Sequence, residues 1–347
     1  MSRTVRGARG GAVRYYHLPA FAGPAALRLD HRETPAPAAR EVLVRMRAWS
    51  LNYRDLLIAD GRYGRGMKAD VVPLSDGAGE VVAVGSEVTR WKPGDRVMSV
   101  FMPRWVSGPA TDAKVAAALG GTVDGVLAEY VTFDQQALVA TPPHLDHPEA
   151  ATLPCAAVTA WHALVVHGGL AAGQTVLTLG SGGVSVFALQ FAVLAGAQAV
   201  VTSGSDAKLE RLLAMGAVAG VNRSSTPQWG AHVRELTGGG VDHVVEVGGA
   251  GTLPQSVRAV RTGGRISVIG VLSRGDGLDP VPLLRKAVTV QGMQVGSRET
   301  SEAMARAVAA HRLRPAVDRA FPFSEARAAY EHLASGGHFG KVVLVAD

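Results

Sequence analysis

Apolar and polar positions alternate in two different ways along the chain, and the pattern changes near residue 159. Upstream, short stretches such as 41–50 (EVLVRMRAWS) alternate apolar and polar residues one by one, which is typical of half-buried strands. Tight turns separate them, for example at 92–97 (KPGDRV), where proline and glycine set the geometry. The pattern predicts a mostly-β region over residues 12–155.

Downstream of residue 159, continuous apolar runs take turns with helical patterns. Strands that are apolar throughout belong to a parallel sheet with helices on both faces, and right-handed crossovers then give a doubly wound α/β domain. The expected strands are 175–179, 199–202, 218–222, 241–247 and 265–271, and the expected helices are 184–195, 206–215, 228–236 and 253–260. The tail, 297–347, is expected to hold two helices and a last strand at 341–345.

A glycine-rich turn, 180–185 (GSGGVS), stands between the first of these strands and the helix after it. Gly180 permits the tight turn, and Gly182 lets the backbone approach a pyrophosphate. The helix that begins near Gly183 and Val184 offers free N–H groups and a positive dipole to the phosphates. We therefore expect a bound dinucleotide here, although the third small position is a serine where the usual pattern has glycine.

The end of the second strand indicates which dinucleotide is bound. NAD enzymes usually carry an acid there for the ribose hydroxyls, but this chain has Ser203 in a stretch of hydroxyl and glycine residues, with no acid before Asp206. A carboxylate about 4 Å from a 2′-phosphate would cost about 1–4 kcal/mol. Its absence, with Lys208 and Arg223 as candidate partners of that phosphate, favours NADP(H), while NAD remains possible. For both cations a solvated surface position is the alternative.

Composition and charge narrow the class of protein. The chain has 347 residues, 47% of them apolar, enough to fill the cores of two domains. It has no apolar run near the roughly 18 residues that span a bilayer and no secretory pattern at its start, so we expect a cytoplasmic protein without a membrane segment. The net charge of +6 comes from scattered side chains, so nucleic-acid binding is not expected.

Taken together, these patterns resemble the medium-chain dehydrogenase/reductase superfamily, and most of all its zinc-free, quinone-oxidoreductase-like branch. The resemblance is carried by SLNYRDLLIADGRYG (50–64), DGAGEVVAVGSEV (76–88), KPGDRV (92–97), AATLPCAAVTAWHAL (150–164), the glycine turn, VDHVVEVGG (241–249), GRISVIG (264–270) and HFGKVV (338–343). It implies a GroES-like, mostly-β catalytic domain made of residues 1–156 and 297–347. It also implies a Rossmann domain over 157–296, a cofactor in the cleft between the two, and a homodimer.

The zinc ligands of metal-dependent superfamily members are mostly replaced in this chain. The resemblance places Asn52 where those members have a cysteine, and Ser75 and Asp76 where they have a histidine and a glutamate. Cys155, the only cysteine, falls on a further ligand position. A catalytic zinc needs about three protein ligands, and the cysteine-free residues 102–121 replace the four-cysteine structural lobe. We therefore expect no metal, and we expect Cys155 to be a small residue near the cleft and not a nucleophile.

Without a Lewis acid, a conjugated acceptor is easier to reduce than a simple ketone, because hydride arriving at its β-carbon sends charge onto a remote oxygen. We expect NADPH-dependent hydride transfer to a quinone or an α,β-unsaturated carbonyl. The resemblance implies that Asn52 orients the nicotinamide ribose or the acceptor carbonyl, and that Tyr63 donates a proton or a hydrogen bond. A turn cap and a packing aromatic are their plainer roles. Arg54 stands where a zinc-type alcohol dehydrogenase has the hydroxyl of its proton relay.

The resemblance also implies further cofactor contacts. Thr159 resembles a family contact to the nicotinamide, and Gly270 and Val271 end a strand near the carboxamide. Lys341 would meet the pyrophosphate, with a surface position as its alternative.

Two other functions remain open. A metal-free alcohol dehydrogenase or ketone reductase would use the same cofactor site, with Tyr53, Arg54 or Tyr63 as proton carrier. A dinucleotide-binding protein with little turnover, contacting RNA through its basic surface, belongs to a different class. Turnover of simple alcohols would favour the first, and salt-dependent RNA affinity the second.

Overall fold

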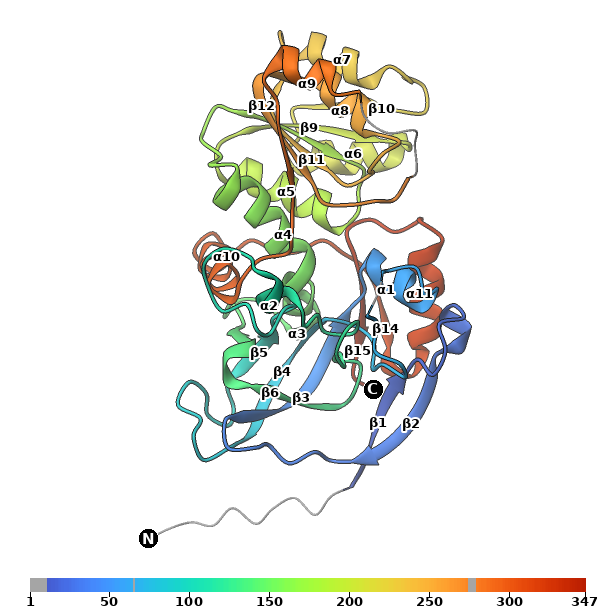
Figure 1. The fold of residues 1–347 in the computed structure, drawn as a ribbon, viewed down its shortest axis with the longest axis vertical. Helices are drawn as coiled ribbons and strands as arrows, with labels where there is room; N and C mark the ends of the chain where they lie inside the picture. Colours follow the sequence, from blue (N-terminus) through green and yellow to red (C-terminus); the bar gives the residue numbers. More distant parts are fainter. Residues whose placement is uncertain (1–10, 65, 274–278) are drawn as a thin grey trace.

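The computed structural model describes residues 11–64, 66–273 and 279–347 (Figure 1). It has two lobes, each built on its own sheet. A parallel sheet forms the upper lobe of Figure 1 and a mixed sheet the lower one. This arrangement confirms the predicted α/β class with a mostly-β partner.

The parallel-sheet lobe has six strands in the order β10-β9-β8-β11-β12-β13. The order reverses between β8 and β11, as in the doubly wound dinucleotide-binding fold, and confirms the predicted Rossmann architecture. The strands are β8 (Thr175–Leu179), β9 (Gln198–Ser203), β10 (Ala219–Asn222), β11 (Val241–Glu246), β12 (Val260–Val268) and β13 (Thr289–Gly292).

Helices cover both faces of this sheet, because alternate residues of each strand point to opposite sides. Val176 packs in the core that α5 and α6 share, whereas Leu177 packs in the core formed with α7 and α8. The sequence pattern does not predict the exposed strand β13 or the short helix α9 (Val281–Lys286). The covering helices are α5 (Gly183–Leu194), α6 (Asp206–Ala214), α7 (Trp229–Leu236) and α8 (Leu253–Ala259).

The mixed-sheet lobe is built from segments of both the N-terminal and the C-terminal parts of the chain. Its seven-stranded sheet runs β14-β15-β3-β4-β5-β7, and β6 pairs with β3. The C-terminal strand β15 pairs antiparallel with β3, with Leu344 opposite Trp49. Its strands are β3 (Glu41–Ser50), β4 (Asp76–Val84), β5 (Arg96–Ser99), β6 (Tyr130–Asp134), β7 (Leu138–Ala140), β14 (Val317–Pro322) and β15 (Lys341–Val345), beside the hairpin of β1 (Ala12–His17) and β2 (Arg28–Glu33).

The remaining helices surround or connect the sheets. A helical segment passes from one lobe to the other as α3 (His147–Ala151), a π-helical turn (Leu153–Ala157), α4 (Val158–Trp161) and a second π-helical turn (His162–His167). The others are α1 (Tyr53–Ala59), α2 (Asp112–Val115), α10 (Arg298–Ala310) and α11 (Ala326–Ala334), with 3₁₀ turns at Pro24–Ala26, Gln135–Ala137 and Phe323–Glu325.

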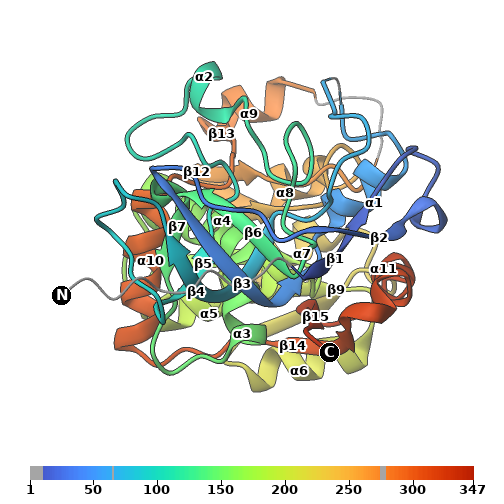
Figure 2. The same ribbon diagram turned by 90° about the horizontal axis from the view of Figure 1, so that it is seen from below.

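The two lobes share buried side chains. One hydrophobic core contains Met98 and Phe101 of the mixed-sheet lobe together with Phe187 and Phe191 of α5. Viewed from below, the red C-terminal elements β14, β15 and α11 lie against the blue and cyan strands (Figure 2). Division of the chain at residues 156/157 and 296/297 therefore stays a proposal. Within the described ranges, no helix has the length and hydropathy needed to cross a membrane.

Candidate active site

A cavity of about 620 Å³ lies at the carboxyl end of β8. This is where the strand order reverses, the usual ligand position in open α/β sheets. Both lobes contribute to its wall, which also includes Phe101 and Cys155. The predicted site residues all line it: Asn52, Arg54, Tyr63, Thr159, Gly180, Gly182, Gly183, Val184, Ser203, Lys208, Arg223, Gly270, Val271 and Lys341. Their chemical roles remain predictions.

The glycine turn presents open backbone to this cavity. Gly180 has a φ of +80°, in the left-handed region that favours glycine. A Cβ on Gly180 or on Gly182 would meet nothing within 4 Å, so a phosphate can approach both. Ser185, where the usual pattern has glycine, is buried and donates its hydroxyl to the Leu179 carbonyl at 2.7 Å. The serine thus holds the helix against the strand and leaves the phosphate-binding surface unchanged.

Two cations lie near the end of β9. Lys208 Nζ donates to the carbonyls of Gly336 and His338, both at 2.9 Å, and burial lowers the pKa of Lys208. A Cβ on Gly204 would lie 3.7 Å from Arg223 Nε. Among the described residues, no Asp or Glu lines the cavity. The structure therefore offers positive charge without a competing carboxylate where a 2′-phosphate would lie.

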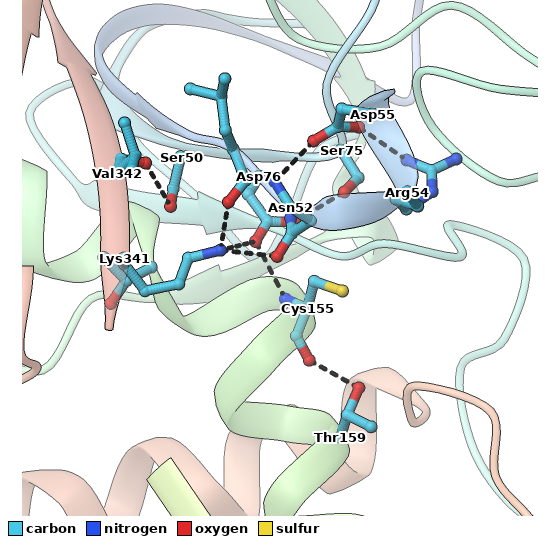
Figure 3. A network of polar contacts seen from close by, with 12 residues as sticks. Ser50, Asn52, Arg54, Asp55, Ser75, Asp76, Cys155, Thr159, Lys341 and Val342 are labelled. Atoms are coloured by element: carbon cyan, nitrogen blue, oxygen red, sulfur yellow. Dashed lines mark hydrogen bonds and ion pairs between the residues drawn. The ribbon is translucent and has the colours of Figure 1, made fainter. Parts of the chain in front are cut away.

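At the other end of the cavity, Lys341 joins a buried polar cluster (Figure 3). Its Nζ donates to the Leu51 carbonyl at 2.6 Å and to Asn52 Oδ1 at 2.5 Å, and lies 4.0 Å from Asp76 Oδ2. Lys341 is only 3% exposed, so the surface alternative is wrong. A Cβ on Gly183 would lie 2.6 Å from Lys341 Cδ, which places the stem of the lysine on the start of α5. A pyrophosphate contact would therefore require the ammonium to leave its present partners.

Asp76 is fixed from three sides. Ser75 Oγ donates to its Oδ1 at 2.6 Å, the Cys155 amide donates to its Oδ2 at 3.2 Å, and the Lys341 ammonium lies beyond. Burial raises the pKa of Asp76 in spite of the lysine. Burial and the nearby Asp76 charge also raise the pKa of the Cys155 thiol, which disfavours the thiolate and agrees with its interpretation as a non-nucleophilic residue.

Asn52 caps a helix and also lines the cavity. It is the N-cap of α1, its backbone N–H donates to Asp55 Oδ2 at 2.7 Å, and its amide oxygen accepts from Lys341. Tyr63 is 39% exposed on the cavity wall, and its ring centroid lies 4.8 Å from the Arg54 guanidinium carbon. The start of α1 thus carries structural and site-facing groups at once.

Arg54 does not suit the proton-carrier role of the alcohol dehydrogenase alternative. Burial acts to lower the pKa of Arg54, but the neighbouring Asp55, Tyr63 and Cys155 outweigh it and the pKa is raised. A guanidinium remains protonated in proteins. Arg54 is therefore a fixed positive charge, and Tyr53 and Tyr63 remain the candidate proton carriers.

Asp55 gives a prediction for stability. Burial raises its pKa from 3.8 to about 6, although Arg54 and the Asn52 amide act in the opposite direction. The folded protein then keeps a proton that the unfolded chain loses between pH 4 and 6, so stability falls as the pH rises through this window. Relative to Asp55→Asn, the wild type should gain about 2–2.5 kcal/mol in free energy of unfolding between pH 7 and pH 4, at about 1.4 kcal/mol for each pKa unit.

Urea unfolding of both proteins at several pH values measures this difference. Titrating groups that do not interact with Asp55 cancel in the comparison, because they are common to the two proteins. Parallel stability curves for wild type and Asp55→Asn would contradict the raised pKa.

The fold and the cavity together define an NAD(P)-dependent oxidoreductase. Residues 38–143 match the family model of the alcohol dehydrogenase GroES-like domain, and residues 183–310 match that of the zinc-binding dehydrogenases. A zinc-type alcohol dehydrogenase-like protein of Schizosaccharomyces pombe is 42% identical over 97% of this chain and 100% of its own length. The chain belongs to the medium-chain dehydrogenase/reductase superfamily.

Two further comparisons agree with this assignment. The quinone oxidoreductase of Lama guanicoe is 27% identical over 96% of this chain and 97% of its own length. A crystal structure from Sinorhizobium meliloti 1021 superposes with a TM-score of 0.90 at 42% identity, covering 96% of this chain and 98% of the other.

The residues present do not fit the zinc that the family name implies. Within the described ranges, no group of three or more His, Cys, Asp or Glu side chains is placed to hold a metal ion. Near Cys155, the carboxylate of Asp76 already faces the ammonium of Lys341. A lysine cation beside the one remaining thiol and carboxylate disfavours a second cation at the same place.

Two buried acids that shape the site, Asp55 and Glu246, are not among the residues predicted from the sequence. Asp55 lies in the short helix α1, and no sequence pattern around it indicates that its carboxylate is buried. Glu246 has a signal, because it is an acid in an apolar strand. It is fully buried and accepts hydrogen bonds from the Gly248 and Gly249 amides at 2.7 and 3.0 Å and from the Thr252 hydroxyl at 2.6 Å, which fixes the turn after β11 on the cavity wall.

Proposed function

We propose that the protein is a zinc-independent NADPH-dependent reductase that transfers hydride to a quinone or an α,β-unsaturated carbonyl. The observation that carries the proposal is the Lys341–Asn52–Asp76 cluster, in which an ammonium lies between side chains at positions where the resemblance places a cysteine and a glutamate of the zinc-dependent members. A conjugated acceptor suits a site without a Lewis acid, since the negative charge is delocalised onto a remote oxygen.

Different residues along the cavity bind the cofactor and orient the substrate. The glycine turn binds the pyrophosphate at the start of α5, and Arg223 and Lys208 bind the 2′-phosphate at the end of β9. The nicotinamide supplies hydride when the cofactor is bound. Asn52, held by Lys341, orients the substrate carbonyl or the nicotinamide ribose. Tyr63, which is partly exposed on the cavity wall, donates a hydrogen bond or a proton to the substrate. The cavity volume of about 620 Å³ is within the range of about 300–1,000 Å³ usual for ligand sites.

The first test is NADPH oxidation by chelator-treated protein against quinones, enones, ketones and aldehydes, with NADH in parallel. We expect turnover of quinones or enones that chelation leaves unchanged and that is faster with NADPH. Activity confined to simple carbonyls, or lost on chelation and restored by zinc, would contradict the proposal.

An alcohol dehydrogenase or ketone reductase is the second candidate function. It is favoured by the similarity to the S. pombe protein and by the half-exposed phenols of Tyr53 and Tyr63 on the cavity wall. Simple alcohols with NAD(P)⁺, assayed beside the acceptor panel, separate the two candidates, because only this one predicts their oxidation.

We also propose that the protein forms a homodimer along β13. All four residues of this strand are exposed, and its outer edge is unpaired in the described structure. Val281 and Leu284 on α9 are exposed beside it. An open edge strand with apolar neighbours is suited to pair with a second copy.

A further inference from the structure

Arg54 carries two buried nitrogen donors that make no hydrogen bond with the described residues. Its side chain is 7% exposed and lines the part of the cavity, beside Asn52 and Lys341, where the proposed substrate would bind. Nε and Nη2 are both buried, and neither has a hydrogen-bond partner among the residues of the described ranges. Buried guanidinium donors are nearly always paired, so a group in this position indicates a ligand that completes it.

The geometry of the guanidinium selects the shape of that ligand. Aromatic rings lie against its carbon, with centroids at 4.8 Å for Tyr63 and 4.5 Å for Phe101, so a ligand can bind only at an edge. Nη1 is engaged, since it donates to the Leu119 carbonyl at 2.9 Å and lies 3.5 Å from Asp55 Oδ1. The free donors, Nε and Nη2, lie on one edge of the plane and point the same way. Two parallel N–H donors match the two oxygens of a carboxylate.

We propose that Arg54 binds a carboxylate carried by the acceptor, so that the preferred substrates are α,β-unsaturated carbonyl compounds bearing a carboxylate. The inference rests on the proposed reductase function. A neutral carbonyl oxygen would have to accept both hydrogen bonds at one atom and brings no charge, whereas a carboxylate offers one charged oxygen to each donor.

The charges around the cavity support this assignment. Arg54 and Lys341 are the cations at the acceptor end, and the ammonium of Lys341 already has two acceptors within 2.6 Å. The fully buried Asp55 balances part of the Arg54 charge, but it faces Nη1 and leaves the other edge free. No Asp or Glu among the described residues lines the cavity, so no carboxylate of the wall itself faces the bound anion.

Gly121 and neighbouring side chains control access to the free edge. A Cβ on Gly121 would lie 2.7 Å from Arg54 Nη2, so the glycine leaves room that any side chain would take. Both free nitrogens are shielded from solvent, so neighbouring side chains have to shift when a carboxylate enters. This makes Gly121→Ala a way to obstruct the edge without removing the charge.

The reaction balances with one NADPH and one proton. For 4-oxopent-2-enoate, hydride from NADPH forms a C–H bond at one alkene carbon, and a proton from solvent or Tyr63 adds to the other. The product is 4-oxopentanoate, the oxidised cofactor is NADP⁺, and the carboxylate bound at Arg54 is unchanged.

The test compares 4-oxopent-2-enoate with its methyl ester, which is intrinsically the more reactive acceptor. For the wild type we expect kcat/KM to be at least tenfold higher for the acid. Arg54→Met should lower kcat/KM for the acid at least tenfold and change it less than threefold for the ester, and Gly121→Ala should act in the same direction. Arg62→Met makes the same charge change at an exposed surface ion pair and should change neither value.

A binding measurement separates this inference from the reductase proposal. In the presence of NADP⁺, calorimetry gives Kd for the unreactive 4-oxopentanoate and its methyl ester. Arg54→Met should weaken binding of the acid at least tenfold and that of the ester less than twofold, whether or not any enone is reduced. If Arg54→Met lowers affinity or kcat/KM equally for the acid and the ester, the role of Arg54 is overturned. The same holds if the wild type reduces neutral enones with no preference for the acid. Absence of all enone and quinone turnover with intact selective binding would overturn only the proposed reaction.

Discussion

Replacement of Lys341 by methionine is expected to lower the free energy of unfolding by about 3–5 kcal/mol, because it removes one partner of a buried charged cluster. The substitution leaves the carbonyl of Leu51 and the amide oxygen of Asn52 without their donor, and it leaves the fully buried Asp76 without its facing cation. Urea unfolding, monitored by tryptophan fluorescence, measures the loss.

The same substitution should reduce kcat/KM by about 100-fold, since misplacement of a positioning group by about 1 Å can cost that much. Asn52 loses the contact that orients its amide, while the glycine turn and the Arg223 end of the cavity remain. NADPH affinity, measured by fluorescence, should therefore change much less than turnover. An equal loss in both would indicate that Lys341 binds the cofactor directly.

Two variants complete this experiment. Lys92→Met removes a lysine whose side chain is 82% exposed and paired with Asp95, and it should cost less than about 1 kcal/mol. Asp76→Asn combined with Lys341→Met removes both charges and should recover part of the lost stability, with a coupling of about 0.5–3 kcal/mol. Additive losses would show that the two charges do not interact.

The Rossmann sheet and its cofactor turn could be predicted because their signals are local. Residues 175–185 hold an apolar strand, a glycine turn and a helix start in sequence, and each has its own pattern. The short strand β13 could not be predicted in the same way, because all of its residues are exposed and no hydrophobic period marks it. Its place follows from pairing with β12, a contact between distant segments.

The candidate site could be predicted as a set of residues but not as a network. Lys341 is far from Asn52 in the sequence, and pairing of β15 with β3 brings them together. No spacing rule shows that the lysine points away from the solvent and toward Asn52. The environment of Arg54 is equally non-local, since Leu119 and Phe101 come from loops outside α1. Tertiary packing, and not sequence pattern, decides which of these polar groups remain unpaired.

Substitutions at the end of β9 are expected to change the preference for NADPH over NADH. The double variant Gly204→Asp with Arg223→Leu is expected to shift the ratio of kcat/KM for NADPH to that for NADH by at least about 30-fold toward NADH, because each change alters a charge contact worth about 1–4 kcal/mol with the 2′-phosphate. Gly204 lies between Ser203 and the start of α6, and its φ lies outside the positive range, so an aspartate there introduces no left-handed strain. The new carboxylate can accept hydrogen bonds from the ribose hydroxyls of NADH.

Affinities for 2′,5′-ADP and 5′-AMP test the same preference without turnover. The variant should lose affinity for 2′,5′-ADP and keep or gain it for 5′-AMP. Arg285→Leu is the matched control, because this exposed arginine is in the same lobe, carries the same charge and does not line the cavity. Arg285→Leu is compared with the single variant Arg223→Leu, which makes the same charge change. If both variants change the NADPH-to-NADH ratio of kcat/KM equally, general surface charge sets the preference. If only Arg223→Leu does so, the end of β9 is where the 2′-phosphate is recognised.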